Sequence, residues 1–304
     1  MRGLTGIRAR LSSSASALAV LMALSLASLP ATGAQKYFES PQAATNAFGM
    51  AVSSNDEGEL RSLFGDDFRT VIPPVGADLR QKFLNAWQAS HSVQQTDAQH
   101  AVIAVGNDGW TFPIPLARTP GGWHFDLGAG VETMRLRRIG QNELAAIQTM
   151  LAIYDAQREY ASAYHDGNKL YAYADRLASS PGKHDGLYWP TGPGDEPSPL
   201  GAAFLTAGAR NATVAGYNGY HYRLLRAQGP HAPGGAYDYM VNGRLFGGFA
   251  VIAWPARYGD TGIKSFIVSH DGQVYSRDLG QDSAKQAEAM RMFDPGPGWE
   301  KESP

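Results

Sequence analysis

The sequence contains no cysteine. This absence excludes structural disulfides, a thiol nucleophile and a lipid anchor attached to a cysteine. The chain also has no HExxH zinc motif, no GxSxG nucleophile elbow, no Walker loop and no dinucleotide-binding glycine pattern. Its eight histidines follow no other zinc-ligand spacing. The sequence therefore favours a non-enzymatic protein whose fold is stabilised by its core alone.

The first 34 residues have the features of a cleaved signal peptide. Arg2, Arg8 and Arg10 make the start positively charged, and residues 17–29 (ALAVLMALSLASL) form an apolar run. A helix-breaking proline and the small residues ATGA follow, as signal peptidase requires. The alternative is a retained membrane anchor, but a span needs about 20 apolar residues and this run is shorter. We expect a mature protein that is periplasmic or secreted and has no membrane span after signal cleavage.

Charge and composition limit the class of partner. Loss of the three leader arginines lowers the net charge from −2 to about −5. An acidic chain argues against nucleic acid or an anionic membrane as the main partner. The 35 glycines and 18 prolines cluster in the second half, which indicates many tight turns between short strands.

The first half of the mature chain changes from a helical to a strand periodicity. Ser40 and Pro41 form a helix start, with serine as the N-cap and proline at the first helical position. Hydrophobic spacing predicts further helices over residues 59–64 and 77–90. Runs rich in β-formers, separated by turns, predict strands over residues 100–105, 110–117 and 123–127. Helices followed by a small antiparallel meander that ends in a GGW-F strand resemble the NTF2-like α+β domain.

The second half is predicted to pack a long helix on an antiparallel sheet. After a basic joint over residues 128–140, a helix is expected over residues 142–165. Leu144, Ile147 and Leu151 begin its main apolar seam, and a second apolar line starts at Met150 and Ile153. The remaining expected elements are a short helix over residues 170–177, an irregular stretch over 179–200, strands over 220–227, 237–241, 249–254, 263–268 and 273–275, and a closing helix over 283–292.

Long motifs throughout the mature chain are similar to one bacterial family, domain of unknown function 2950. That family has no established activity to transfer. The motifs that carry the resemblance are FESPQAA (38–44), FPIPLARTPGGWHFDLGAG (112–130), RRIGQNELAAIQ (137–148), DAQREYA (155–161), PGKHDGLYWP (181–190), SPLG (198–201), AQGPHAPGGAYDYMVNG (227–243), GGFAVIAWPARYG (247–259) and HDGQVYSRDLG (270–280).

A looser resemblance links the C-terminal half to the soluble domain of type IV pilins and type II secretion pseudopilins. It rests on the long helix, the GYHY strand (219–222), the pattern AxPxxYGxxG (253–262) and FIVxxDGxV (266–274). The apolar half of a pilin helix is missing here, which implies a soluble module that does not polymerise as pilins do. The expected organisation is a signal peptide (1–34), an NTF2-like α+β domain (35–130) and a pilin-like domain (131–304).

The candidate ligand-binding residues lie in two segments of the second half. Asp185, Tyr188 and Trp189 place an acid beside aromatic rings in an irregular loop, a combination that suits a sugar- or peptide-binding platform. Asp238 and Tyr239 lie on a strand that can approach this loop. The competing interpretation is a turn whose aromatic side chains fill the edge of the sheet.

No cofactor is predicted, although the pilin-like resemblance implies calcium as an alternative. Asp260, Asp271 and Asp278 are the acids in the matching region, and they do not form an EF-hand ligand series. We interpret the chain as a non-enzymatic binding or assembly module whose partner is an envelope protein or a cell-wall component. The alternative is an envelope hydrolase acting on glycan or peptide, with acids such as Asp126 and Asp155 at the domain joint.

Overall fold

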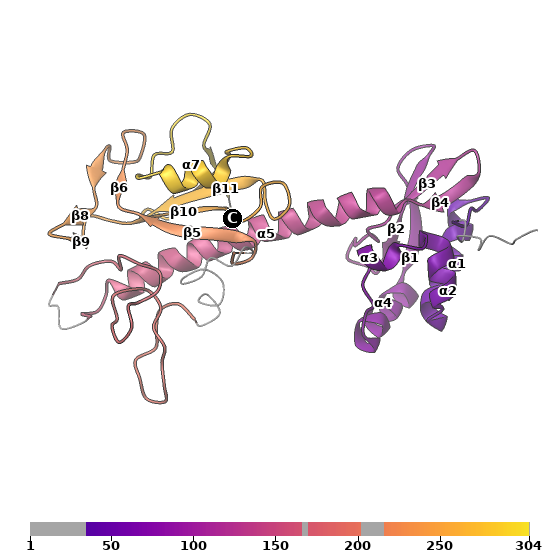
Figure 1. Cartoon of the computed structure of the whole chain (residues 1–304), viewed down its shortest axis with the longest axis horizontal. Coiled ribbons are helices and arrows are strands. Elements are labelled where there is room, and N and C mark those ends of the chain that lie inside the picture. The colour runs from indigo at the N-terminus through magenta and orange to yellow at the C-terminus, as the bar shows by residue number, and fades with distance from the viewer. Residues whose placement is uncertain (1–34, 166–169, 202–215, 304) are drawn as a thin grey trace, which may run out of the picture.

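Two hydrophobic cores lie at opposite ends of one long helix, α5 (Leu127–Tyr160), as Figure 1 shows. The computed structural model describes residues 35–165, 170–201 and 216–303, so the expected signal peptide lies outside the described residues. The 34 residues of α5 correspond to a length of about 50 Å. In the described part of the chain, no helix has both the length and the apolar character needed to cross a membrane.

The N-terminal core is built from short helices and a small antiparallel sheet, as predicted. The ring of Phe48 lies at its centre, between 4.6 and 5.9 Å from five other aromatic rings. The predicted N-cap is confirmed, because Ser40 Oγ accepts the backbone N–H of Ala43 at 3.1 Å. The elements are α1 (Pro41–Ser54), α2 (Glu57–Phe64), α3 (Phe68–Val71), α4 (Ala77–Ala89), β1 (His91–Gln95), β2 (His100–Val105), β3 (Leu116–Thr119) and β4 (Gly122–Phe125), with the strands paired in the order 1-2-3-4.

The long helix begins much earlier than the sequence predicted. Asp126 is its N-cap and accepts the backbone N–H of Ala129 at 2.9 Å, so the expected joint over residues 128–140 is helical. Gly130 permits this course, since a Cβ there would lie 2.7 Å from Ile114 Cγ1 in the first core. The first turns of α5 therefore pack on the N-terminal core, while its later turns belong to the second core.

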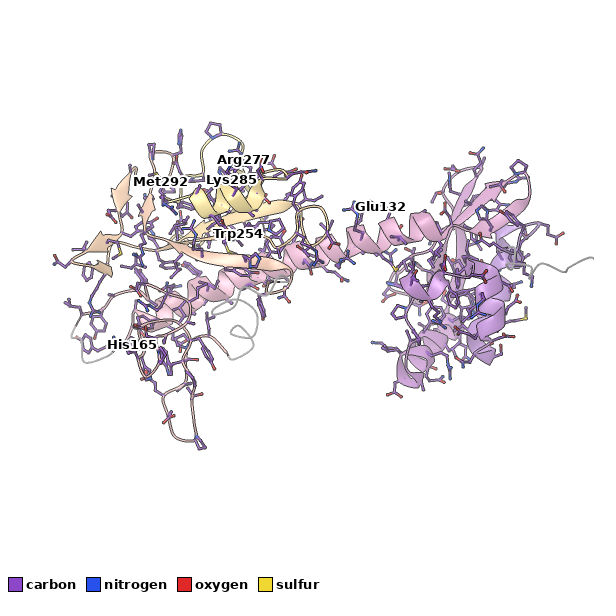
Figure 2. The ribbon with its side chains drawn as sticks, in the orientation of Figure 1. Glu132, His165, Trp254, Arg277, Lys285 and Met292 are labelled. Carbon is purple, nitrogen blue, oxygen red and sulfur yellow. The ribbon has the colours of Figure 1, made fainter. Side chains whose placement is uncertain are left out.

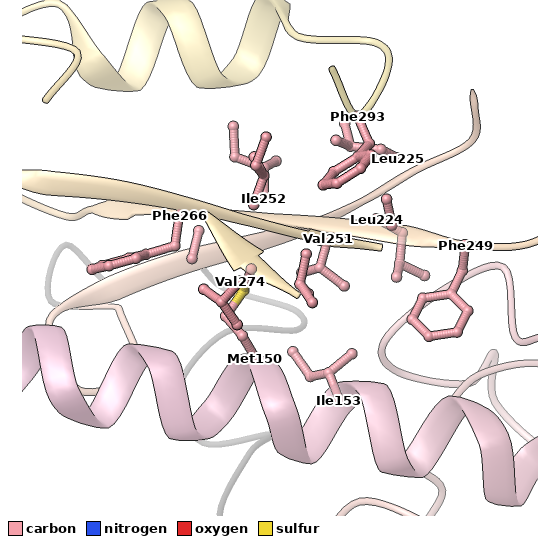
Figure 3. Packing of buried hydrophobic residues seen from close by; sticks show 14 of the residues in the cluster. Met150, Ile153, Leu224, Leu225, Phe249, Val251, Ile252, Phe266, Val274 and Phe293 are labelled. Carbon is pink, nitrogen blue, oxygen red and sulfur yellow. The ribbon is translucent and has the colours of Figure 1, made fainter. Parts of the chain in front are cut away.

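The second core is a five-stranded antiparallel sheet between α5 and α7 (Figure 3). Met150 and Ile153 point from α5 to one face of the sheet, and Ile252 and Phe293 lie on the α7 side. Leu144, predicted in the main apolar seam, is instead 66% exposed, whereas Met150 and Ile153 of the second predicted line are fully buried. The elements are β5 (Tyr220–Leu225), β10 (Ala250–Pro255), β11 (Lys264–Ser269), β12 (Val274–Asp278), β13 (Glu300–Lys301) and α7 (Ser283–Ala289), with the strands in the order 13-12-11-10-5.

Two short hairpin-like pairs extend this domain beyond β5. β6 (Ala227–Gln228) pairs with β7 (Tyr237–Asp238), and β8 (Met240–Val241) pairs with β9 (Arg244–Leu245). A tight turn joins β8 to β9. Its residues Asn242 and Gly243 both have positive φ (50° and 77°), which favours the Asn-Gly pair. Residues 170–177 are not helical where the structure describes them, which corrects the sequence prediction.

Candidate functional site

A groove of about 710 Å³ follows β5, the last strand of the large sheet. Its floor is the run from Tyr222 to Ala227, and one wall is formed by residues 175–178. Asp238, Met240 and Arg291 complete the lining. Four of the lining residues are arginines, Arg176, Arg223, Arg226 and Arg291, and we call this feature the arginine groove.

Arg223 is anchored in the groove by the end of α7. Its guanidinium donates to the carbonyl oxygens of Ala287 and Met290, both at 2.6 Å, and so binds the negative end of the helix. Its buried Nε has no hydrogen-bond partner among the described residues. Burial and the neighbouring Arg291 charge lower the pKa of Arg223, while the charge of Glu288 acts in the opposite direction. The charge of Arg223 therefore adds to the groove, while its donors serve mainly to fix the end of α7.

Arg226 and Arg291 supply exposed positive charge along the same groove. The exposed side chain of Arg226 makes no hydrogen bond or ion pair with any described residue. Arg291 donates to the carbonyl oxygen of Glu288 at 2.9 Å, a contact that leaves its formal charge uncompensated. A guanidinium presents its donors in a planar fork that matches a carboxylate. These two side chains therefore favour an anionic ligand.

The acids of the groove are already engaged within the protein. Asp175 pairs with Arg176 at 3.0 Å, and Asp185 lies 3.6 Å from the same guanidinium. Asp238 is exposed and uses its carboxylate to accept the backbone N–H of Met240 at 2.7 Å. Arg176 is therefore compensated. Asp238 is the one carboxylate among the lining residues that is not in an ion pair, and it shares the groove with three further arginines.

Two of the five candidate ligand-binding residues lie at or next to the arginine groove. Asp238 lines it, and Asp185 touches Arg176 from behind its wall. Burial acts to raise the pKa of Asp185, but hydrogen bonds from Ser180 and the charge of Arg176 lower it overall. Asp185 accepts the backbone N–H of Ser180 at 2.7 Å and so fixes the loop behind the groove.

The three aromatic candidates pack against the interior of the domain. Trp189 is 2% exposed and Tyr239 is fully buried, with its hydroxyl donating to Gln228 at 2.9 Å. Tyr188 is half-buried, and its backbone N–H donates to the carbonyl oxygen of Leu177 at 3.0 Å. These positions match the competing interpretation, in which aromatic side chains fill the edge of the sheet. A ligand-binding role for the five residues stays a prediction.

The acids named for other sites do not come together. Asp126 and Asp155 lie 29 residues apart on one continuous helix, which separates them by about 43 Å. They cannot act on one glycosidic or peptide bond from that distance. The three acids named as calcium candidates each bind a different side chain of the protein. Asp260 is bound by Arg138 and Arg257, Asp271 by the hydroxyl of Ser269, and Asp278 by the hydroxyl of Tyr258.

The family model described as "Protein of unknown function (DUF2950)" matches residues 35–302. The chain belongs to the DUF2950 family. The match includes both cores and the whole of α5, and it confirms the family resemblance in the sequence motifs. No curated protein and no solved structure matches this DUF2950 chain. The NTF2-like and pilin-like resemblances accordingly stay predictions.

No local signal in the sequence indicates the arginines of the groove. They come from the segment after Ala174, from β5 and the residue after it, and from the residues after α7. Arg223 is recognisable as a charged residue in an otherwise β-rich apolar strand. Pairing that strand with the end of α7 requires the tertiary fold.

Proposed function

We propose that this DUF2950 protein is a non-enzymatic binding module of the bacterial envelope that holds an acidic, extended segment of an envelope protein in the arginine groove. Export by the N-terminal leader is part of the proposal. The observation that carries it is the convergence of Arg223, Arg226 and Arg291 in a chain whose net charge is −2. A local excess of positive charge in an acidic protein selects an anionic ligand and steers its approach.

The shape of the groove supports an extended chain as the ligand. The floor follows the run from Tyr222 to Ala227 along a strand direction. At about 3.3 Å per residue, this run is about 20 Å long and can accompany a segment of similar length. The guanidinium groups of Arg226, on the floor, and of Arg291, elsewhere in the lining, match carboxylates spaced along such a segment.

The apolar part of the lining supplies the remaining contact area. Leu177, Leu224 and Met240 lie among the polar residues of the groove. Binding sites commonly combine an apolar surface with a few oriented polar groups. An acidic segment with interspersed apolar side chains fits this arrangement better than a uniformly polar polymer. This argument favours a protein segment over a cell-wall glycan.

Photo-crosslinking in cells tests the proposal directly. A benzoylphenylalanine probe replaces Met240, which lines the groove, and a matched control probe replaces its neighbour Val241, which is 47% exposed and does not line it. We expect the Met240 probe to capture one envelope protein through an acidic peptide, identified by mass spectrometry. We expect the Val241 probe not to capture it.

Charge-reversal variants complete this test. Arg226→Glu with Arg291→Glu should abolish capture by the Met240 probe. Arg118→Glu, the same change at an exposed arginine of β3 in the N-terminal domain, should leave capture unchanged. Capture that survives the double reversal contradicts the proposal. An adduct that consists of cell-wall glycan also contradicts it, because the ligand is then a polymer of a different class.

A further inference from the structure

Three side chains with metal-binding atoms converge at the far end of α5, away from the N-terminal core. They are His165, His184 and Glu196, and one ligand atom from each lies within 4.8 Å of the other two. His165 follows the last turns of α5, where Figure 2 shows it among the irregular segments of the second domain. The three residues lie 19 and 12 positions apart in one stretch of the chain, and this spacing matches no common zinc motif.

His165 has one ring nitrogen prepared to bind a metal. Its Nε2 lies 2.9 Å from the carbonyl oxygen of Tyr160. A carbonyl oxygen accepts hydrogen bonds, so Nε2 carries the proton and Nδ1 carries the lone pair. Nδ1 is buried and has no hydrogen-bond partner among the described residues, and the side chain is 9% exposed. Metal-binding histidines commonly donate their other nitrogen to a backbone carbonyl in this way.

Tyr160 and Trp189 hold the three candidate ligands in place. The His165 ring stacks on Tyr160 at 3.9 Å, and the His184 ring stacks on Trp189 at 4.2 Å. Trp189 Nε1 donates to the backbone carbonyl of Glu196 at 3.0 Å, and the Tyr160 hydroxyl donates to that of His184 at 2.6 Å. The two buried aromatic side chains therefore restrict the positions of all three candidate ligands.

We propose that His165, His184 and Glu196 bind one divalent transition-metal ion, with zinc as the best match. Two imidazoles and one carboxylate form a ligand set that suits zinc and leaves a fourth position for water. Calcium prefers oxygen ligands and does not suit this set. Tetrahedral zinc places its ligands about 3.4 Å apart, so the cluster has to contract. Glu196 is exposed and can move to achieve this.

The metal would cross-link a part of the domain with little regular structure. Residues 170–201 contain isolated bridges and turns where the structure describes them, and the chain has no cysteine to form a disulfide. A metal that joins the end of α5 to two points of this segment restricts it as a disulfide would. This inference is independent of the ligand in the arginine groove.

Zinc titration of the mature protein tests the site. The protein is prepared without a polyhistidine tag, stripped with a chelator and titrated with zinc by calorimetry, and with cobalt by visible absorption. We expect one ion per chain and a cobalt spectrum of tetrahedral type. His184→Gln and Glu196→Gln should each weaken zinc binding by about tenfold or more.

A matched histidine variant distinguishes this site from general histidine binding. His231→Gln removes an exposed histidine that pairs with Asp294, and it should bind zinc as the unchanged protein does. Circular dichroism checks that each variant is folded. Binding of less than one zinc per chain by the unchanged protein overturns the proposal. Undiminished zinc binding by the folded His184→Gln, Glu196→Gln double variant overturns it as well.

Discussion

Gln157 and Ala174 exchange two hydrogen bonds inside the second core. The side-chain Nε2 of Gln157 donates to the carbonyl oxygen of Ala174, and the backbone N–H of Ala174 donates to Oε1, both at 2.9 Å. Gln157 is fully buried and Ala174 is 1% exposed. The side-chain amide of Gln157 thus makes the two backbone hydrogen bonds that a neighbouring strand would otherwise make. It fixes the segment that forms one wall of the arginine groove.

Replacing Gln157 with leucine should destabilise the protein strongly. The change keeps the side-chain volume but leaves both backbone groups of Ala174 buried without partners, at a cost of about 2–4 kcal/mol. Chemical denaturation followed by circular dichroism measures this free energy of unfolding. Glu159→Ala, at an exposed position of the same helix, should change it by less than about 0.5 kcal/mol. Equal effects of the two variants would show that the paired hydrogen bonds are unimportant.

Two glycines of α5 should respond to alanine in opposite directions. At Gly130 an added Cβ would lie 2.7 Å from Ile114 Cγ1 and 3.2 Å from its Cα, so Gly130→Ala should cost about 1–3 kcal/mol. No heavy atom lies within 4 Å of a Cβ at Gly140, so Gly140→Ala should stabilise the helix by about 0.5–1 kcal/mol. Thermal unfolding of both variants checks the pair. A stabilised Gly130→Ala would contradict the packing of α5 on the first core.

The side-chain carboxylate of Glu302 should make stability depend on pH in the acid range. The hydroxyl of Ser276, at 2.6 Å, and the ammonium of Lys264, at 2.9 Å, hold the pKa of Glu302 below its ordinary value of 4.5. A depressed pKa in the folded state stabilises the protein above pH 4.5, and this contribution is lost as the pH falls through the folded-state pKa.

The comparison between the unchanged protein and Glu302→Gln measures this contribution. We expect the variant to be less stable by about 1 kcal/mol at pH 7, with the difference shrinking steadily as the pH falls below 4.5. Glu39→Gln removes an exposed carboxylate that has no hydrogen-bond partner among the described residues, and it should show no such trend. A Glu302→Gln difference that is constant from pH 7 to pH 3 would contradict the assignment.

The sequence predicted those elements whose ends and periodicity are set by residues close together in the chain. The Ser40 N-cap, the helix starting at Ala77 and the strand from His100 to Val105 were all predicted correctly. β1 was missed because its residues are mostly polar and exposed, so no alternation marks it. The start of α5 was missed because that stretch lies between the cores and leaves Leu136 half exposed, without an apolar seam.

Tertiary contacts explain the wrong helix prediction for residues 170–177, and they explain why two candidate sites were not predicted. Residues 170–177 have an acceptable helical sequence, but Gln157 binds the backbone of Ala174, and Tyr173 forms a bridge with Leu245 instead. The arginine groove unites residues from distant segments, and the histidine cluster unites residues 165, 184 and 196 of one largely irregular stretch. The spacing of the groove arginines does not identify them, because the packing of α5 and α7 on the sheet decides which residues become neighbours. The irregular course of the chain after α5 brings the cluster together in the same way, with no regular spacing.

The central claim is that the arginine groove binds acidic extended segments, and fluorescence anisotropy with a labelled hexaglutamate peptide tests it most directly. The mature protein should bind this peptide, more weakly as salt increases, and should not bind hexalysine. Arg226→Glu with Arg291→Glu should weaken binding by about tenfold or more, which corresponds to about 1.4 kcal/mol, whereas Arg118→Glu should not change it. Equal affinity of the double variant and the unchanged protein would contradict the account.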